Sequence, residues 1–210
     1  MPHLLYIESS PRKERSASIK IAKAFLDEYK KTHPDDTIET LDLWNTELPS
    51  FDGDTINAKY SLLHARPESD AERKAWEPVA KTIDNFMRAD KIVISIPMWN
   101  FGIPYKLKHF IDIIIQPSYT FSYSPEAGYK GLVKNKSALL VFASGGAYSS
   151  DMETEGLDHQ RSYMNLIMGF MGFTDIKSII AEPMLMSTPE EKLEIIEGAK
   201  AEARNLAATF

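Results

Sequence analysis

Four serines surround a candidate helix start that follows the apolar run at residues 4–7. They are Ser9, Ser10, Ser16 and Ser18. Hydroxyl donors beside the free N–H groups of a helix N-terminus suit an anion, a phosphate in particular. Serines are also ordinary loop and cap residues, so the segment alone leaves both interpretations open. The basic residues Arg12, Lys13 and Arg15 flank Glu14, and we interpret them as solvated rather than ligand-binding.

A second polar segment lies between Pro97 and Pro104 and holds an amide, two aromatic rings and a glycine. Pro97 ends an apolar run, and Pro104 suits the first position of a following helix. Asn100 can donate and accept hydrogen bonds, and the rings of Trp99 and Phe101 could stack on a flat ligand. The combination favours a planar heterocycle with a polar edge. The alternative is a structural loop whose aromatic rings fill the core.

A third segment, Ser144-Gly145-Gly146, also follows an apolar run. Glycines let backbone N–H groups face a ligand without an obstructing Cβ, although a lone Gly-Gly pair is more often a simple turn. The serine segment holds no glycine, which excludes a dinucleotide fingerprint or a P-loop there. Together, the three segments could bind a phosphate, a flat ring and the polar edge of that ring. Flavin mononucleotide (FMN) presents all three.

Alternating strands and helices are needed to bring these segments together. Hydrophobic patterning predicts strands at about 4–7, 37–43, 91–97, 136–143 and 176–181. Helices are predicted near 16–31, 69–88, 105–116, 157–171 and from 188 onward, with a short one near 56–64. Pro78 is expected to kink or delay the helix that contains it. The residues at 120–132 are expected to form extended pieces and turns.

This alternation predicts an α/β protein in three layers, with a five-stranded parallel sheet in one domain spanning residues 1–210. Of the two common doubly wound orders, the flavodoxin-like order 2-1-3-4-5 fits the strand count. In that order the first, third and fourth strands are neighbours. The loops that carry the three polar segments would therefore meet at the carboxyl edge of the sheet.

Composition narrows the possible functions. The chain has 210 residues, a formal net charge of -6, no basic tract and no cysteine. Nucleic acid and membrane are therefore not expected as partners, and thiolate catalysis and disulfides are excluded. The five histidines are scattered without ligand spacing, so no metal site is expected. A cytoplasmic protein fits these features best.

The motifs, taken together and in order, resemble the FMN-dependent NADH-azoreductase family, which comprises flavodoxin-like NADH:quinone oxidoreductases. The resemblance covers nearly the whole chain. It rests on residues 5–12 with Ser16 and Ser18, residues 97–104, Leu107-Lys108 with Asp112, residues 120–123 and residues 144–146. Two departures stand out. Ser144 is followed directly by Gly145, where many members carry a longer charged residue, and Trp99 stands where tyrosine is common.

The resemblance implies FMN as cofactor and a homodimer with two FMN sites at the subunit interface. The FMN phosphate would be bound by Ser10, Ser16, Ala17 and Ser18. Its isoalloxazine ring would lie along Pro97, Met98, Trp99, Asn100 and Phe101. Its pyrimidine side would contact Ala143, Ser144, Gly145 and Gly146. Trp99, Phe121 and Tyr148 would line the substrate pocket, partly from the second subunit.

The implied activity is a ping-pong cycle in which NADH reduces the flavin and a quinone or azo compound then reoxidises it. No acid–base triad is expected, and Tyr148 is a candidate proton donor or a packing residue. No residue that would read the ribose can be placed, so NADH and NADPH both remain open as donors. The alternatives are a flavodoxin-type electron carrier without small-molecule turnover and a cofactor-free regulatory domain.

Overall fold

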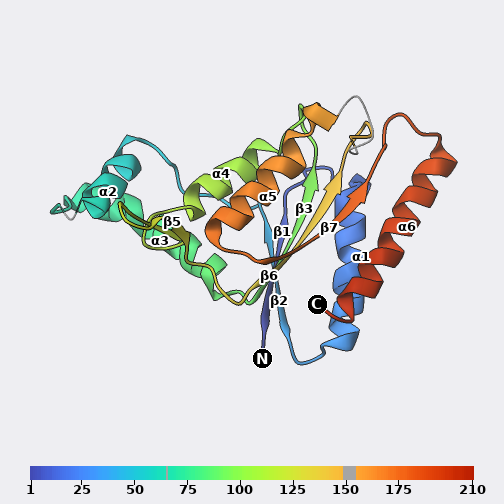
Figure 1. Ribbon diagram of the computed structural model, residues 1–210, viewed down its shortest axis with the longest axis horizontal. Coiled ribbons are helices and arrows are strands. Elements are labelled where there is room, and N and C mark those ends of the chain that lie inside the picture. The colour runs from blue at the N-terminus through green and yellow to red at the C-terminus, as the bar shows by residue number, and fades with distance from the viewer. Residues whose placement is uncertain (65, 149–154) are drawn as a thin grey trace.

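A five-stranded parallel sheet forms the centre of the protein (Figure 1). The computed structural model describes residues 1–64, 66–148 and 155–210. The sheet order is β2-β1-β3-β6-β7. Counted among the sheet strands alone, this is the predicted order 2-1-3-4-5, which is therefore confirmed. The strands are β1 (His3–Glu8), β2 (Thr37–Asp42), β3 (Lys91–Pro97), β6 (Ser137–Ala143) and β7 (Asp175–Ala181).

The three central strands are buried because helices cover both faces of the sheet. β1, β3 and β6 each contain five consecutive buried residues, as expected of parallel strands without a wet face. Ile94 pairs with Ile7 of β1 and with Leu140 of β6, which sets the register across the centre. β2, at one edge, has no fully buried residue. Its alternating sequence is thus explained by its position.

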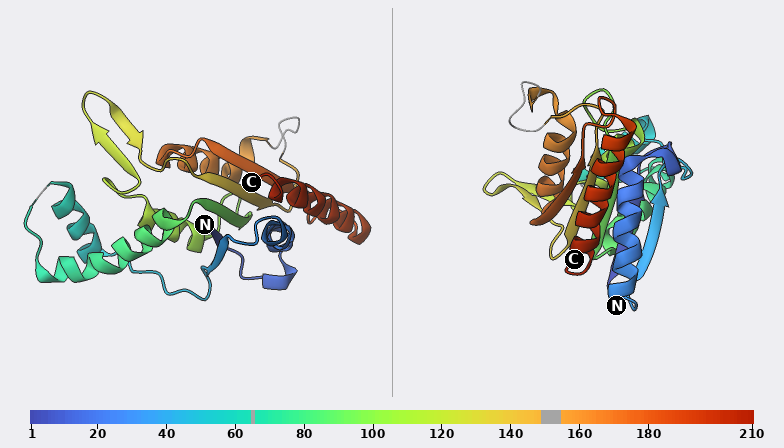
Figure 2. Two further views of the ribbon diagram at one scale, coloured as in Figure 1. Left: turned by 90° about the horizontal axis from the view of Figure 1, so that it is seen from below. Right: turned by 90° about the vertical axis from the view of Figure 1, so that its right-hand side faces the viewer.

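Helices α1 (Ala17–Thr32) and α6 (Pro189–Ala207) cover one face of the sheet, as Figure 2 shows in its right-hand view. Helices α3 (Asp70–Arg88), α4 (Tyr105–Ile114) and α5 (His159–Met171) lie on the other face. Each face has its own apolar core, and alternate residues of β1 enter one core or the other. The three predicted layers are confirmed.

Local signals at the helix ends were largely correct. Ser69 and Glu72 form a reciprocal capping box at the start of α3, and Thr188 and Glu191 form another at α6. The expected delay at Pro78 is wrong, because α3 runs without interruption from residue 70 to 88. Pro78 lies on the exposed side of the helix, where water can satisfy the freed carbonyl.

Two segments project from the sheet on the side of α3 (Figure 2, left). One carries α2 (Gly53–Leu63), which confirms a short helix near the predicted residues 56–64. The other is an antiparallel hairpin of β4 (Phe121–Ser124) and β5 (Gly128–Gly131). Two short 3-10 turns, Lys13–Arg15 and Glu155–Leu157, complete the elements. In the part of the chain that the structure describes, no helix is long and apolar enough to cross a membrane.

Candidate functional site

The three polar segments meet at the carboxyl edge of the sheet, where hydrogen bonds link each to the next. The Ser9 hydroxyl donates to the carbonyl of Ser95, at 2.6 Å. The Met98 N–H donates to the carbonyl of Ala143, at 2.8 Å. The Ser144 N–H in turn donates to Ala181, at 3.2 Å. The loops after β1, β3, β6 and β7 therefore form one continuous rim.

The serine segment presents the start of α1 without a cap. All four serines are buried, and Ser16 and Ser18 place their hydroxyl oxygens 3.1 Å apart. Ser16 stands at the N-cap position, yet no side chain caps α1 and its first turn holds no acidic residue. Side chains cap α2, α3, α5 and α6 in the ordinary way. The free N–H groups and the positive dipole end of α1 thus remain available to an anion.

Lys13 anchors the serine segment to the sheet. Its ammonium lies 2.7 Å from Glu8 and 2.5 Å from Asp42, so it is not the solvated residue that its sequence neighbours indicated. Burial disfavours the charged forms of both Lys13 and Asp42. Hydrogen bonds outweigh this effect, so the pKa of Lys13 is raised and the pKa of Asp42 is lowered. Arg12 and Arg15 are exposed, as expected.

The segment after β3 is a tight turn in an unusual backbone conformation. Trp99 and Gly102 exchange two hydrogen bonds of 2.9 Å, with Asn100 and Phe101 between them. Both central residues have positive φ, 48° for Asn100 and 66° for Phe101. Asparagine tolerates this region, whereas the phenylalanine costs about 1 kcal/mol or more. The turn exposes both side chains at the rim, and such strain is typical of a functional site.

Trp44 connects the serine segment to this turn, a role the sequence did not single out. Its indole N–H donates to the carbonyl of Ser9 at 2.9 Å. Its ring lies 5.7 Å from that of Trp99 and 5.4 Å from that of Tyr105, measured between centroids. The sequence feature that could have predicted this role is the position of Trp44, two residues beyond β2 and so at the same carboxyl edge of the sheet.

The glycine segment after β6 carries Tyr148 into the site. The Tyr148 hydroxyl lies 3.0 Å from the position that a Cβ on Gly146 would take. The Tyr148 ring packs edge-on against Phe101, with 6.2 Å between centroids. A Cβ on Gly145 would meet Leu185 at 2.7 Å. The glycines therefore permit close approach of neighbouring side chains as well as of any ligand.

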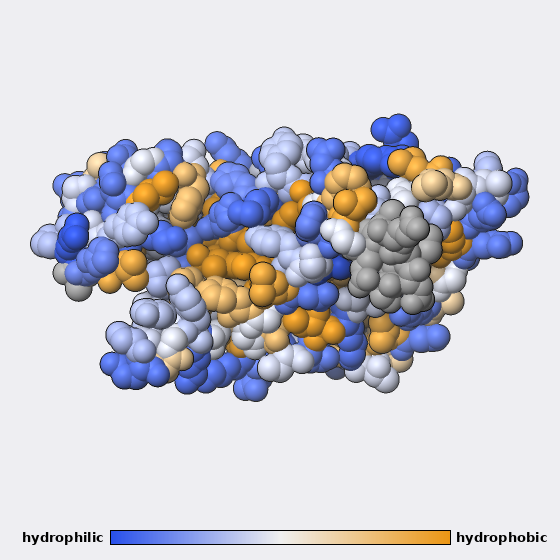
Figure 3. All heavy atoms as spheres, turned by 45° about the horizontal axis from the view of Figure 1, so that its top comes forward, coloured by the Kyte–Doolittle hydropathy of each residue, from blue (hydrophilic) through white to orange (hydrophobic). Residues whose placement is uncertain are grey.

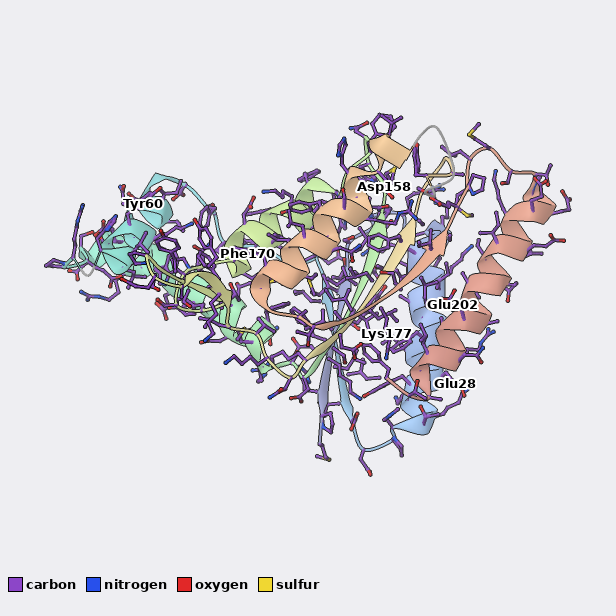
Figure 4. All side chains as sticks on the ribbon, viewed as in Figure 1. Glu28, Tyr60, Asp158, Phe170, Lys177 and Glu202 are labelled. Atoms are coloured by element: carbon purple, nitrogen blue, oxygen red, sulfur yellow. The ribbon has the colours of Figure 1, made fainter. Side chains whose placement is uncertain are left out.

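Phe121 lies elsewhere in the single chain. Its ring packs with Phe170 and Tyr129, at 5.0 and 6.0 Å between centroids. Phe170 is near the C-terminal end of α5, whereas Asp158 and the rim lie at its other end (Figure 4). One chain therefore brings Trp99 and Tyr148 to the same rim and leaves Phe121 on the hairpin.

A cavity of about 770 Å³ opens beside Trp99 and Asn100. Its remaining lining comes from α2, α4, α5 and the loops beside them, and it combines apolar and aromatic side chains with Lys59, Lys108, His109 and Asp112. Figure 3 shows apolar atoms gathered in a hollow on one face of the molecule. Burial lowers the pKa of Lys59 on one wall and raises the pKa of Tyr163 on another to about 12. Within the described residues, no group of three or more acidic or histidine side chains is placed to hold a metal ion.

Comparison with known proteins fits this geometry. A family described as having a flavodoxin-like fold matches residues 2–207. A relative from Desulfotalea psychrophila, named FMN-dependent NADH:quinone oxidoreductase, is 46% identical over 209 residues, covering 99% of this chain and 97% of the relative. The solved azoreductase of Bacillus anthracis superposes with a TM-score of 0.91 at 34% identity, over 100% of both chains.

A second solved structure from Bacillus anthracis, an FMN-dependent NADH-azoreductase in complex with FMN, gives a TM-score of 0.87 at 29% identity, over 99% of this chain and 100% of that one. The likeness thus extends over the whole chain in sequence and in structure. The chain belongs to the flavodoxin-like family of FMN-dependent NADH:quinone oxidoreductases and azoreductases.

Proposed function

We propose that this protein is an FMN-dependent oxidoreductase that passes electrons from NADH to quinones and azo compounds. The observation that carries the proposal is the uncapped start of α1 on the same rim as the strained turn at Asn100 and Phe101. A phosphate site and a flat-ring site side by side are what FMN requires. The names of the similar proteins support both the cofactor and the two substrate classes.

The residues present fit FMN. The phosphate would accept hydrogen bonds from the hydroxyls of Ser10, Ser16 and Ser18 and from the backbone of Ala17, in a segment without a repelling carboxylate in the first helical turn. The ring would lie along residues 97–101. The backbone of residues 143–146 would reach its polar edge.

When bound, FMN supplies the redox chemistry between the electron donor and the acceptor. The protein binds and orients. N–H groups of Gly145 and Gly146 would stabilise negative charge at the cofactor's polar edge, and the Asn100 amide would fix its position. Trp99 and Phe101 would exclude water from the reacting face. Tyr148 is placed to donate a hydrogen bond to an acceptor or to pack against it.

Both substrates would use one open face in turn, which would make the cycle ping-pong. We further propose that residues 1–210 form one FMN-binding domain, that the protein is cytoplasmic and that it is a homodimer. The family match over residues 2–207 supports the first point, and the lack of cysteine is consistent with the second. In a homodimer, the hairpin of one subunit could bring Phe121 to the pocket of the other, which one chain alone does not do.

The test is the visible spectrum of the purified, FMN-reconstituted protein, followed by phosphate analysis and steady-state oxidation of NADH with a quinone or an azo dye. We expect flavin absorbance, one phosphate per flavin and sustained turnover. NADPH in place of NADH measures donor preference. Bound FMN without turnover would favour the electron-carrier alternative. A protein that stays colourless after reconstitution would refute both, leaving the regulatory domain.

A further inference from the structure

Arg161, in the first turn of α5, makes contacts that reach beyond its own helix. Its side chain is 19% exposed. The guanidinium binds the Asp158 carboxylate through Nε, donates to the carbonyl of Tyr148 through Nη2 and lies 3.6 Å from Glu182 through Nη1. Asp158 also caps α5 by accepting from the Arg161 N–H at 2.9 Å. One planar cation thus joins three segments, a task that suits arginine better than lysine.

Two of the partners belong to the rim. Tyr148 ends the described part of the glycine segment. Glu182 follows β7 and lies 2.9 Å from the hydroxyl oxygen of Ser144, at the start of the same segment. Arg161 therefore holds the segment Ser144–Tyr148 at one end directly and at the other through Glu182. The neighbouring Gln160 amide donates to Ile96 at 3.0 Å, so the same helical turn is also tied to β3.

The carboxylates of Asp158 and Glu182 depend on Arg161 for a compensating positive charge. In the described residues, Asp158 and Glu182 each form an ion pair with Arg161 alone. Their side chains are only 7% and 12% exposed. Buried ionic networks add little net stability, because desolvation offsets their attraction, but they require accurate geometry.

The contacts continue from Arg161 to the proposed ring site. Its hydrogen bond fixes the backbone of Tyr148, whose ring packs on Phe101 of the strained turn and whose hydroxyl lies over Gly146. Displacement of Tyr148 would therefore disturb both Phe101 and Gly146, two of the residues proposed to contact the ring of the cofactor. Arg161 itself is outside this contact surface.

We propose that Arg161 is a positioning residue of the flavin site. It holds the Ser144–Tyr148 segment so that the backbone at Gly145 and Gly146 and the ring of Tyr148 keep the geometry needed for cofactor and acceptor. This inference rests on the proposed function and adds a residue to it.

The test compares Arg161→Lys with Arg73→Lys. Arg73 makes the same pairing three residues after an aspartate, in the first turn of α3, but it is 66% exposed and its 3.2 Å contact is with Asp70. Arg161→Lys keeps the charge that compensates the buried carboxylates and loses the fork that reaches Tyr148. The measurements are the FMN dissociation constant by fluorescence, kcat and KM for a quinone at saturating FMN, and the melting temperature of the apoprotein.

We expect Arg161→Lys to weaken FMN binding and raise the quinone KM, each roughly tenfold, with kcat within about twofold. The apoprotein melting temperature should change by less than about 4 °C. Arg73→Lys should match the wild type throughout. Arg161→Met should weaken binding further and lower the melting temperature, because it leaves two buried carboxylates uncompensated.

Equal FMN binding and quinone KM in Arg161→Lys and Arg73→Lys would overturn the proposal. The proposal would also be overturned if Arg161→Met lost FMN binding and Arg161→Lys kept it at the wild-type level, because the positive charge alone would then suffice. If the wild type and Arg73→Lys bind no FMN, the proposed function itself fails, and this inference falls with it.

Discussion

Ser16 occupies the N-cap position of α1 while its hydroxyl pairs with Ser18 instead of capping the helix. A capping side chain is worth about 1 kcal/mol, so a site that forgoes one gives up stability. At other helix starts the N-cap side chain does accept a hydrogen bond from the first turn, as those of Asp52, Ser69 and Thr188 do. We interpret the missing cap as the cost of leaving the N–H groups free for phosphate.

Ser16→Asp should therefore separate stability from cofactor binding. Aspartate is a good N-cap and favours the positive end of the helix dipole, so the apoprotein should melt at the same or a higher temperature. The same carboxylate would repel the phosphate and weaken FMN binding about 100-fold or more. Fluorescence titration and thermal melts measure the two effects, with Ser178→Asp at an exposed position of β7 as control. Unchanged FMN affinity in Ser16→Asp would remove the phosphate assignment.

At the level of elements, the β4–β5 hairpin is joined to α5 by direct backbone contact. Gly172 ends α5 with a φ of 111°, and the N–H of Val133 donates to Met171 at 2.9 Å. A Cβ on Gly131 would lie 2.5 Å from the backbone of Gly172. The projecting hairpin is therefore held at its base by a contact that only glycine permits.

Gly131→Ala should lower the free energy of unfolding by roughly 3 kcal/mol, because backbone atoms at that distance must move apart. Gly198→Ala, within α6 and with nothing within 4 Å of its Cβ, should raise it by about 0.5–1 kcal/mol. Urea denaturation of both variants gives the comparison. A Gly131→Ala protein as stable as the wild type would mean that the hairpin base is loosely packed.

For the whole molecule, the two faces of the sheet differ in what they expose. On the α6 side, the exposed large apolar side chains are Leu193 and, in the segment that leads into the helix, Leu185 and Met186. The α5 face and the projecting segments show many more, which are Phe101, Tyr105, Leu157, Leu166, Tyr60, Leu62, Leu63, Tyr123 and Tyr129. Exposed apolar side chains that gather on one side of a protein mark a candidate interface. This asymmetry supports the proposed homodimer.

Leu166→Glu tests that proposal. Leu166 is 69% exposed in the single chain, so a charge there should leave the fold intact and dissociate the dimer. Light scattering should show a monomer, and NADH oxidation should fall if the pocket needs both subunits. Leu193→Glu, at a leucine 60% exposed on the opposite face, should remain dimeric and active. A dimeric Leu166→Glu protein would place the interface elsewhere.

The sequence by itself determined the strands, the helices, their order and the three polar loops. These features depend on local patterns: buried runs mark parallel strands, and Ser69 and Thr188 mark helix starts. The sheet order also followed, because right-handed crossovers leave few topologies for five such strands. The expected delay at Pro78 failed because the buried face of α3 holds the helix in place, while water can satisfy the carbonyl freed on its exposed side.

Only the tertiary structure decided which side chains meet at the rim. The ion pairs of Lys13, the bridging ring of Trp44 and the reach of Arg161 join residues from elements whose spacing along the chain gives no hint of contact. It also showed that the turn at Phe101 is strained and that Phe121 is remote within one chain. The physical reason is that such contacts depend on sheet register and helix packing, which arise only when distant parts of the chain are assembled.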